Sequence, residues 1–268
     1  MMGRPYLASP ISETGNSRTR GRAESVAQPT VALVRCAPLP PVVLASVELQ
    51  SDSLKTLYSN RFSAEAEQRQ DIWQVLCTDF FQRWVPTDAT VLDLAAGHCE
   101  FINNITAGRR IAVDLNPDVK VRAAEGVETH VLRSDSLTGI ESGSIDRVFI
   151  SNFFEHINHE TILATLVEVR RVLKPSGQLL LLQPNVRYCA KDYWQFFDHI
   201  TPVDDRAMVE AFAQTGYRVV KNIPRFLPYT TKSRLPSGPA LVRLYLKVPL
   251  AWRVLGAQAF MVATPVAD

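Results

Sequence analysis

Acidic and amide side chains follow several apolar segments of this 268-residue chain, at spacings that suit nucleoside binding. Gly97 lies in the turn Ala95–Cys99, after the apolar segment "TVLDL", and Asp114 follows 17 residues later at the end of "RRIAVDLN". Asp135 and Asn152 end the next two apolar segments. A carboxylate at Asp114 can accept hydrogen bonds from both ribose hydroxyls, and a side chain at Asp135 can reach an adenine amino group. The pattern therefore favours a nucleoside-containing cofactor.

The turn itself departs from the dinucleotide-binding fingerprint G-x-G-x-x-G/A. Its three defining positions are occupied by Ala95, Gly97 and Glu100. A pyrophosphate binds at a helix N-terminus through free N–H groups and the positive end of the helix dipole. The Glu100 carboxylate would repel a pyrophosphate at that place. The turn therefore argues against NAD and for a nucleoside cofactor without phosphates.

The segments that carry these residues alternate between strand and helix patterns. Continuous apolar runs such as "QLLLLQPN" are typical of strands buried on both faces of a parallel sheet. Apolar residues three and four positions apart predict helices that cover such a sheet. The expected strands are 90–96, 109–116, 129–135, 146–154, 178–185, 217–223 and 257–266, and the expected helices are 63–84, 100–108, 160–177 and 204–216. This alternation predicts a doubly wound α/β domain.

Composition limits the classes of function that the chain can have. A net charge of +2, with scattered basic residues, is too small to predict nucleic-acid binding. The four cysteines form no CxxC pair and fit reduced thiols better than disulfides or zinc. The chain shows no apolar run of membrane-spanning length and no signal-peptide pattern, so a cytoplasmic protein is expected.

The composition also predicts how the chain is divided. Residues 1–50 are rich in Ser, Arg, Gly and Pro and are expected to form a disordered N-terminal arm. Residues 51–268 are expected to form the folded domain. Within it, residues 51–86 form an N-terminal helical cap and residues 228–256 a lid or acceptor-side segment.

Five motifs occur in the order and spacing of a known family: "VLDLAAGHCEFINNI", "AVDLNP", "SDSL", "SNFFEHI" and "LKPSGQLLLLQPN". The sequence resembles the class I S-adenosylmethionine-dependent methyltransferases over these motifs. The resemblance implies a Rossmann-like fold, with a mostly parallel seven-stranded sheet and an antiparallel last strand. "LYSNRF" and "FFDHITPVDD" are similar to segments of the bacterial methyltransferases that act on small molecules, sugars or lipid-linked glycans. Ala95 and Cys99 depart from the usual turn, which carries glycines.

The resemblance also implies roles for individual residues, with S-adenosylmethionine as the cofactor. Arg61 would pair with the cofactor carboxylate, and Asp114 would hold the ribose. The other expected cofactor contacts are Asp93, Ala95 and Gly97 near the methionine part, Leu115, Asp135 and Ser136 near the adenosine, and Asn152 and Phe153 near the methyl donor.

His199, in "QFFDHITP", is the candidate general base, because histidine titrates near neutral pH and can accept a proton from an acceptor hydroxyl. The alternative is a histidine that fixes the loop before the next helix. Glu155-His156 resembles a metal-binding pair of some quinone-forming methyltransferases. The accompanying carboxylate is replaced here by Asn152, a poor ligand for a hard cation. No metal is therefore expected, and the pair is expected to cap the following helix and pack under the cofactor.

The acceptor is expected to be a small molecule, a sugar or a lipid-linked glycan, with no nucleic acid as partner. It is expected between "DYWQFFDH" and the segment from Arg234 to Gly256. Trp194, Phe196 and Phe197 could wall its pocket, and the same connections carry Tyr229, Tyr245 and Trp252. Residues 239–256 are apolar with spaced basic residues and could form a lid, a homodimer contact or a peripheral membrane contact. A nicotinamide-dependent oxidoreductase and a non-catalytic binding module remain as alternative functions.

Overall fold

The computed structural model describes residues 66–229 and 238–266. Several predictions concern residues outside these ranges. They are the N-terminal arm, the first part of the helical cap, Arg61 and part of the lid. The expected domain boundary near residue 51 therefore stays a prediction.

One sheet contains seven strands in the order β3-β2-β1-β4-β5-β7-β6. The pairings among β1 to β5 are parallel, whereas β7 pairs antiparallel with both β5 and β6. The seven-stranded α/β sheet with an antiparallel last strand, predicted from the sequence, is thus confirmed. The strands are β1 (Thr90–Leu94), β2 (Arg109–Asp114), β3 (Val127–Val131), β4 (Ile145–Ser151), β5 (Leu173–Pro184), β6 (Tyr217–Leu227) and β7 (Gln258–Pro265).

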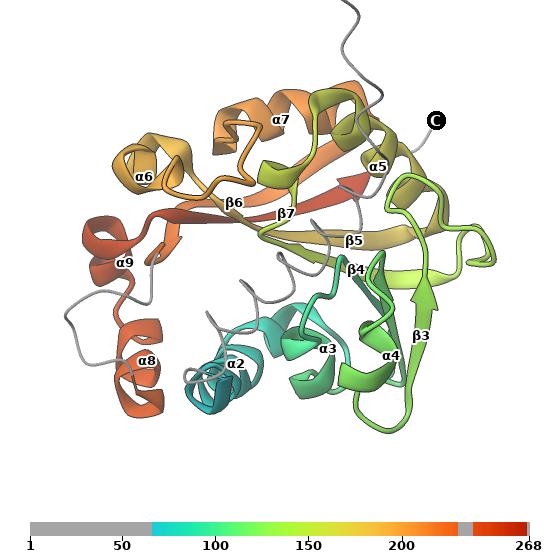
Figure 1. The fold of residues 1–268 in the computed structure, drawn as a ribbon, viewed down its shortest axis with the longest axis horizontal. Helices are drawn as coiled ribbons and strands as arrows, with labels where there is room; N and C mark the ends of the chain where they lie inside the picture. Colours follow the sequence, from blue (N-terminus) through green and yellow to red (C-terminus); the bar gives the residue numbers. More distant parts are fainter. Residues whose placement is uncertain (1–65, 230–237, 267–268) are drawn as a thin grey trace, which may run out of the picture. The chain divides into compact units, whose positions relative to one another are not determined.

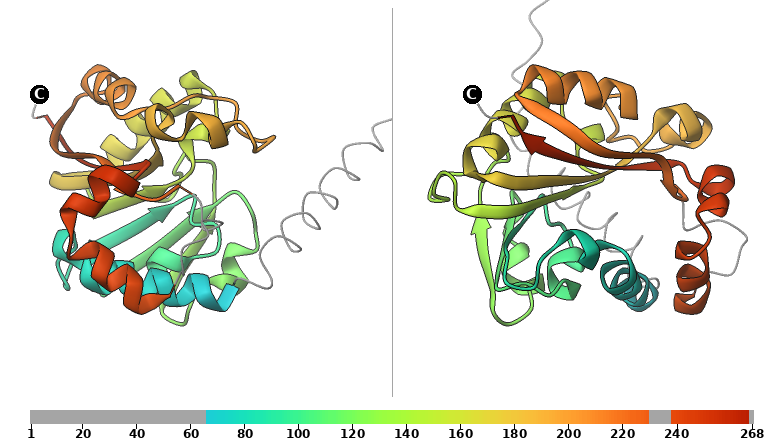
Figure 2. Two further views of the ribbon diagram at one scale, coloured as in Figure 1. Left: turned by 90° about the vertical axis from the view of Figure 1, so that its left-hand side faces the viewer. Right: turned by 180° about the vertical axis from the view of Figure 1, so that it is seen from behind.

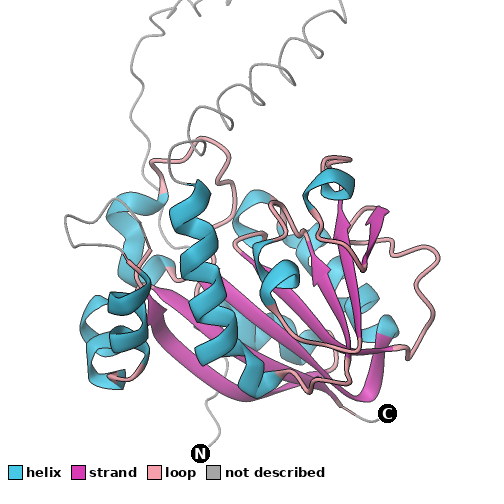
Figure 3. Ribbon diagram, turned by 90° about the horizontal axis from the view of Figure 1, so that it is seen from below, coloured by secondary structure: helices cyan, strands magenta, loops and turns pink. Residues whose placement is uncertain are grey.

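Helices cover both faces of the sheet, because alternate residues of its buried strands are apolar on both sides. α5 and α7 pack on one face, and α2, α3, α4 and α8 pack on the other. Figure 1 shows α5 and α7 above the sheet and α2, α3 and α4 below it, and in the view from below helices lie in front of the strands (Figure 3). The helices are α2 (Ala66–Asp79), α3 (Glu100–Asn104), α4 (Val119–Arg122), α5 (His159–Val172), α6 (Val186–Tyr193), α7 (Asp205–Gln214), α8 (Pro239–Leu246) and α9 (Pro249–Leu255), with 3₁₀ turns η1 (Phe81–Trp84) and η2 (Phe154–His156). None of these described helices has the length and apolar character that crossing a membrane requires.

Most of the helices and strands predicted from the sequence are present, but they begin or end at other residues than predicted. The expected helix 63–84 is divided into α2 and η1, and Pro249 begins a second helix after α8. The helix expected over 160–177 ends at Val172, because Leu173 already pairs with Ile145 as part of β5. Helix α6, which the sequence pattern did not predict, contains a non-helical residue, Cys189, that interrupts its regular turn.

The strand predicted over 129–135 is wrong in its second half. β3 is an edge strand that pairs only with β2, and its last partner is Asp114, opposite Val131. Because β2 ends there, the chain after β3 has no partner strand to extend the ladder. It instead forms a tight turn with an isolated bridge between Arg133 and Ser136.

The turn between β1 and α3 has an unusual backbone. Ala95, Gly97 and Cys99 have φ values of 58°, 53° and 60°, in the left-handed region that favours glycine. A left-handed residue with a side chain costs roughly 1–2 kcal/mol. A Cβ added at Gly97 would meet nothing nearer than the Ala95 carbonyl oxygen at 4.0 Å, so the space beside this glycine is open. The turn thus holds strained backbone beside an open surface, as binding sites often do.

This backbone predicts an unusual response to glycine at position 95. Ala95→Gly should leave the free energy of unfolding unchanged or raise it by up to about 1 kcal/mol, because relief of the left-handed strain offsets the greater unfolded-state entropy of glycine. Ala123, at φ −66°, supplies the control, and Ala123→Gly should lose about 0.5–1 kcal/mol. Urea denaturation of both variants checks this. A loss in Ala95→Gly as large as in the control would contradict the strained turn.

Candidate functional site

The ends of β1, β2 and β4 lie side by side at one edge of the sheet. Leu94, the last residue of β1, pairs with Val113 on one side and Ile150 on the other. The segments that follow these parallel strands therefore leave the sheet at the same edge, which is where ligands bind in folds of this type. The structure thereby brings together the turn at Gly97, Asp114 and Asn152, as the sequence predicted.

Asp114 is fixed by two backbone hydrogen bonds, one to each carboxylate oxygen. The N–H of Gly97 donates to Oδ2 at 2.8 Å, and the N–H of Asn116 donates to Oδ1 at 2.7 Å. Each oxygen keeps a further lone pair that can accept a hydrogen bond from a ligand hydroxyl. Leu115, the next residue, exposes 67% of its surface to solvent at this edge. The pair offers an acceptor group and an apolar surface to the same ligand.

Two further carboxyl groups lie under the turn, on Asp93 and Glu100. Asp93 is only 2% exposed, and burial, followed by the nearby charge of Glu100, raises its pKa well above the usual range. Burial also raises the pKa of Glu100, and the opposing influence is Arg69, whose guanidinium lies 2.6 Å from the Glu100 carboxylate. Asp93 thus faces the interior beneath the turn and not the open surface.

Arg69 forms an ion pair with Glu100, so the Glu100 carboxylate alone does not explain why this turn disfavours a pyrophosphate. The sequence suggested a free carboxylate at Glu100, but α2 supplies a cation that partly compensates its charge. Burial raises the pKa of Asp93 and Arg69 pairs with Glu100, so Asp114 is the carboxylate that the turn offers to a ligand. Carboxylate oxygens accept hydrogen bonds, which suits ligand hydroxyls better than a phosphate.

Asp135 lies in the turn after β3 and not at the end of the strand. Arg133 holds its carboxylate in a two-point ion pair, with nitrogen–oxygen distances of 2.9 and 2.7 Å. This hydrogen-bonded pairing keeps the pKa of Asp135 below its usual value, so the group remains an ionised acceptor. The hydroxyl of Ser136 lies 3.2 Å from that of Thr138. Arg133 therefore already uses part of the hydrogen-bonding capacity of the Asp135 carboxylate.

Asn152 directly follows β4 and has a φ of 47°, a left-handed conformation that asparagine tolerates better than most residues. Its N–H donates to the carbonyl of Leu182 on β5 at 2.9 Å. The side chain of Asn152 is exposed, whereas Phe153 is partly buried and packs on the core under α5 and α7. The chain thus turns sharply at the place where the sequence predicted the methyl donor.

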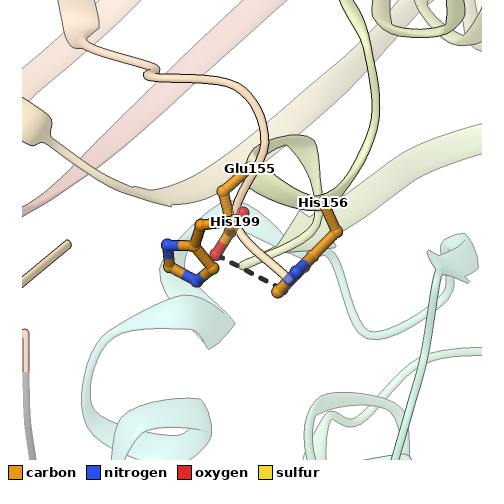
Figure 4. Close-up of side chains that lie close together, drawn as sticks. All are labelled: Glu155, His156 and His199. Atoms are coloured by element: carbon orange, nitrogen blue, oxygen red, sulfur yellow. Dashed lines mark ion pairs between the residues drawn. The ribbon is translucent and has the colours of Figure 1, made fainter. Parts of the chain in front are cut away.

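His199 lies in a cluster with Glu155 and His156, although the two segments are more than 40 residues apart (Figure 4). Its ring stacks on Phe196, with ring centres 5.0 Å apart, and meets Tyr193 edge-on at 4.7 Å. His199 is 8% exposed, and its Nδ1 atom has no hydrogen-bond partner among the residues that the structure describes. Burial lowers the pKa of His199, and the neighbouring His156 lowers it further. The ring is therefore held neutral with a free nitrogen, which suits a proton acceptor.

Glu155 is buried in this cluster and does not cap α5. The residue that caps the helix is Asn158, whose side chain accepts the N–H of Thr161 at 2.8 Å. The expected capping role of Glu155-His156 is therefore wrong, because the pair lies in η2, before the helix starts. Gln183 donates to the Glu155 carboxylate at 2.8 Å, and the backbone N–H groups of Ile200 and Thr201 donate to the Glu155 carbonyl. Glu155 thus ties the His199 loop to β5.

The same cluster has the donor set of a small metal site. Glu155, His156 and His199 each place one ligand atom within 4.8 Å of the other two. A carboxylate with two imidazoles suits zinc and other transition metals better than magnesium. The sequence pattern indicates the Glu155-His156 pair, but His199 joins it only through the fold.

The aromatic residues expected at the acceptor side are separated by the fold. Phe196 and Tyr229 lie beside Tyr193 and His199, whereas Trp194 and Phe197 are exposed on the loop after α6. Tyr245 and Trp252 instead pack on the core with α2. A hollow of about 310 Å³ lies elsewhere, along β6, lined by Phe80, Arg83, Trp84, Lys221, Ile223 and Trp252. Because its lining contains no carboxylate, it does not resemble a ribose site.

Residues 92–181 match the family model described as a methyltransferase domain. This segment runs from β1 into β5 and contains the turn, Asp114, Asp135 and Asn152. Among curated proteins, none matches the chain significantly.

Solved structures share the fold at low sequence identity. A SAM-dependent methyltransferase from Archaeoglobus fulgidus is 18% identical, with a TM-score of 0.58 over 78% of this chain and 99% of that one. The chain described as a methyltransferase in a complex with the Haloferax volcanii Trm112 methyltransferase activator is also 18% identical, with a TM-score of 0.56 over 80% and 96%. A SAM-dependent methyltransferase from Methanosarcina mazei is 14% identical, with a TM-score of 0.51 over 70% and 97%. Residues 92–181 thus match a methyltransferase domain, and the described part of the chain shares the fold of S-adenosylmethionine-dependent methyltransferases.

Proposed function

We propose that this domain methylates a hydroxyl group of a small-molecule, sugar or lipid-linked glycan acceptor. The observation that carries the proposal is the buried ring of His199, whose Nδ1 atom has no partner and whose faces contact Phe196 and Tyr193. Aromatic faces suit sugar rings and flat apolar groups alike. The His199 loop follows β5 and is tied by backbone hydrogen bonds to Glu155, which follows β4, so it lies near the expected methyl donor.

In this proposal the turn and strand ends hold the cofactor. The carboxylate of Asp114 accepts the ribose hydroxyls, and Leu115 covers one face of the adenine. Asp135 and Ser136 contact the rest of the adenosine, and Ala95 and Gly97 let backbone N–H groups approach the methionine part. Asp93 supports the turn from below, because it is buried. Asn152 and Phe153 line the methyl donor, and Arg61 pairs with the cofactor carboxylate.

The proposed reaction is an in-line displacement, to which the protein contributes alignment and a proton acceptor. When bound, S-adenosylmethionine would supply an activated methyl group for transfer to the acceptor oxygen. The proton of the acceptor hydroxyl would pass to the imidazole of His199. The nearby Glu155 carboxyl would stabilise the positive charge that the imidazole then carries. Phe196 and Tyr193 hold the ring in place and exclude water.

The two alternative functions make different demands on the same residues. A nicotinamide-dependent oxidoreductase needs a turn that accepts a pyrophosphate, and the Asp114 carboxylate bonded to the Gly97 N–H does not favour one. A non-catalytic module needs no ordered proton acceptor, yet the chain buries His199 with a free nitrogen. Both observations favour the methyltransferase.

Replacing Asp114 tests the ribose contact. Asp114→Asn should weaken binding of S-adenosylhomocysteine by about 1–3 kcal/mol, because charge-assisted hydrogen bonds are lost. Asp88→Asn, in the exposed loop before β1, should leave the affinity unchanged. Calorimetry with the 2′,3′-dideoxy analogue separates a ribose contact from a loosened turn. The parent protein should discriminate between the two ligands, and the Asp114 variant should do so much less. Equal discrimination in both proteins would remove Asp114 from the ribose site.

Replacing His199 tests the proton acceptor and the acceptor class together. With a panel of hydroxyl acceptors, His199→Gln should lower turnover about 10²-fold or more while the melting temperature and the S-adenosylhomocysteine affinity stay unchanged. His159→Gln, exposed at the start of α5, is the matched control. Because its pKa is lowered, His199 stays neutral at pH about 6.5, so turnover should fall only at more acid pH.

Three results would overturn this role. Normal turnover in folded His199→Gln would show that no base acts at this position. A midpoint of the pH profile at or above about 6.5 would contradict the buried, neutral ring. Turnover that is lost with a chelator and restored by Zn²⁺ or Mn²⁺ would assign the cluster of Glu155, His156 and His199 to a metal instead.

A further inference from the structure

The outward side of α8 and α9 carries a dense group of exposed apolar side chains. Leu250 and Val254 expose 69% and 67% of their surface, and Leu244 exposes 58%. In the left view of Figure 2, α8 and α9 face the viewer. We call this surface the α8–α9 face, and its apolar members are Leu241, Leu244, Val248, Leu250, Val254 and Leu255.

The inward side of the same two helices is firmly attached to the domain. Trp252 and Tyr245 pack on the core, and the Tyr245 hydroxyl donates to the carbonyl of Phe226 at 2.6 Å. Arg225, on β6, donates to the carbonyl of Gly256 at 2.8 Å and to that of Val254. The exposed side chains are therefore held on a fixed support, and their exposure is not the result of a loose segment.

All charged side chains on these helices and their junctions are basic. Between Gly238 and Gly256 the sequence contains Arg243, Lys247 and Arg253 and no acidic residue. Arg243 lies 3.6 Å from Asp79 of α2. Within the described part of the chain, no acidic group pairs with Lys247 or Arg253. Exposed leucine and valine interleaved with cations match a surface that is both anionic and apolar.

The α8–α9 face also lies at the edge of the sheet that carries the site. Helix α9 leads into β7, whose first residue, Gln258, pairs with the last residue of β5. The carbonyl of Ala257 accepts the N–H of Asn185 at 2.9 Å, at the carboxyl end of β5. A partner bound to this face would therefore lie at the edge of the sheet where the strands β1, β2, β4 and β5 end.

We propose that the α8–α9 face binds the surface of an anionic lipid bilayer. Its apolar side chains enter the boundary between headgroups and acyl chains, and Lys247 and Arg253 contact the anionic headgroups. A second copy of this chain fits less well, because a two-fold contact would bring the same cations of both copies together. The proposal does not depend on the identity of the acceptor, since lipid binding needs no methyl transfer.

Co-sedimentation of the full-length chain with vesicles tests this surface. Vesicles of phosphatidylcholine with phosphatidylglycerol should bind the protein roughly tenfold or more tightly than phosphatidylcholine alone, and high salt should weaken the binding. Leu250→Asp with Val254→Asp should abolish the preference for anionic vesicles. Val167→Asp with Val209→Asp, on α5 and α7 at the other face of the sheet, should leave it unchanged.

The melting temperature and S-adenosylhomocysteine affinity of each double variant verify that it is folded. Equal binding of the parent protein to both kinds of vesicle, or no binding, would overturn the proposal. Anionic binding that survives in folded Leu250→Asp with Val254→Asp would place the lipid contact elsewhere in the chain. A concentration-dependent dimer in ultracentrifugation that this variant disrupts would show that a second copy covers the face, which also overturns it.

Discussion

The hydrogen bond from the Gly97 N–H to the Asp114 carboxylate, 2.8 Å long, joins the turn after β1 to the end of β2. Parallel pairing already places the ends of these strands side by side, with Leu94 opposite Val113. The bond then fixes the turn above them, and the second bond, from Asn116, orients the same carboxylate. A ligand that uses Asp114 therefore meets a group whose position is determined before binding, which lowers the entropic cost of the contact.

The surroundings of this bond explain why the turn can retain strained residues. Ala95 and Cys99 adopt left-handed torsions without being glycine, and the helix that follows is short. Buried packing on both sides of the sheet supplies the stability that offsets such strain. Below the turn, Asp93 and Glu100 lie close together, and Arg69 from α2 compensates part of their charge. The result is a turn whose Gly97 N–H is already bonded to Asp114 and whose space beside Gly97 is open.

The sequence predicted the sheet well because its central strands are buried on both faces and read as continuous apolar runs. The prediction from sequence is wrong where the apolar pattern is weak, and it misses contacts between segments that are far apart in the chain. The end of β3 was placed too late, since an edge strand stops where its only neighbour stops. The sequence pattern predicts a helix cap at Glu155-His156, whereas Asn158 supplies the cap. Neither the Arg69–Glu100 pair nor the approach of His199 to Glu155 can be derived from local spacing, because both depend on packing between distant segments.

Titration calorimetry of the full-length chain with S-adenosylhomocysteine and with NAD tests the central claim most directly. That claim is that the Asp114 carboxylate, held against the turn at Gly97, selects a nucleoside cofactor without phosphates. The account predicts saturable binding of S-adenosylhomocysteine at one site per chain and no detectable heat with NAD. Saturable binding of NAD, together with no response to S-adenosylhomocysteine, would contradict it.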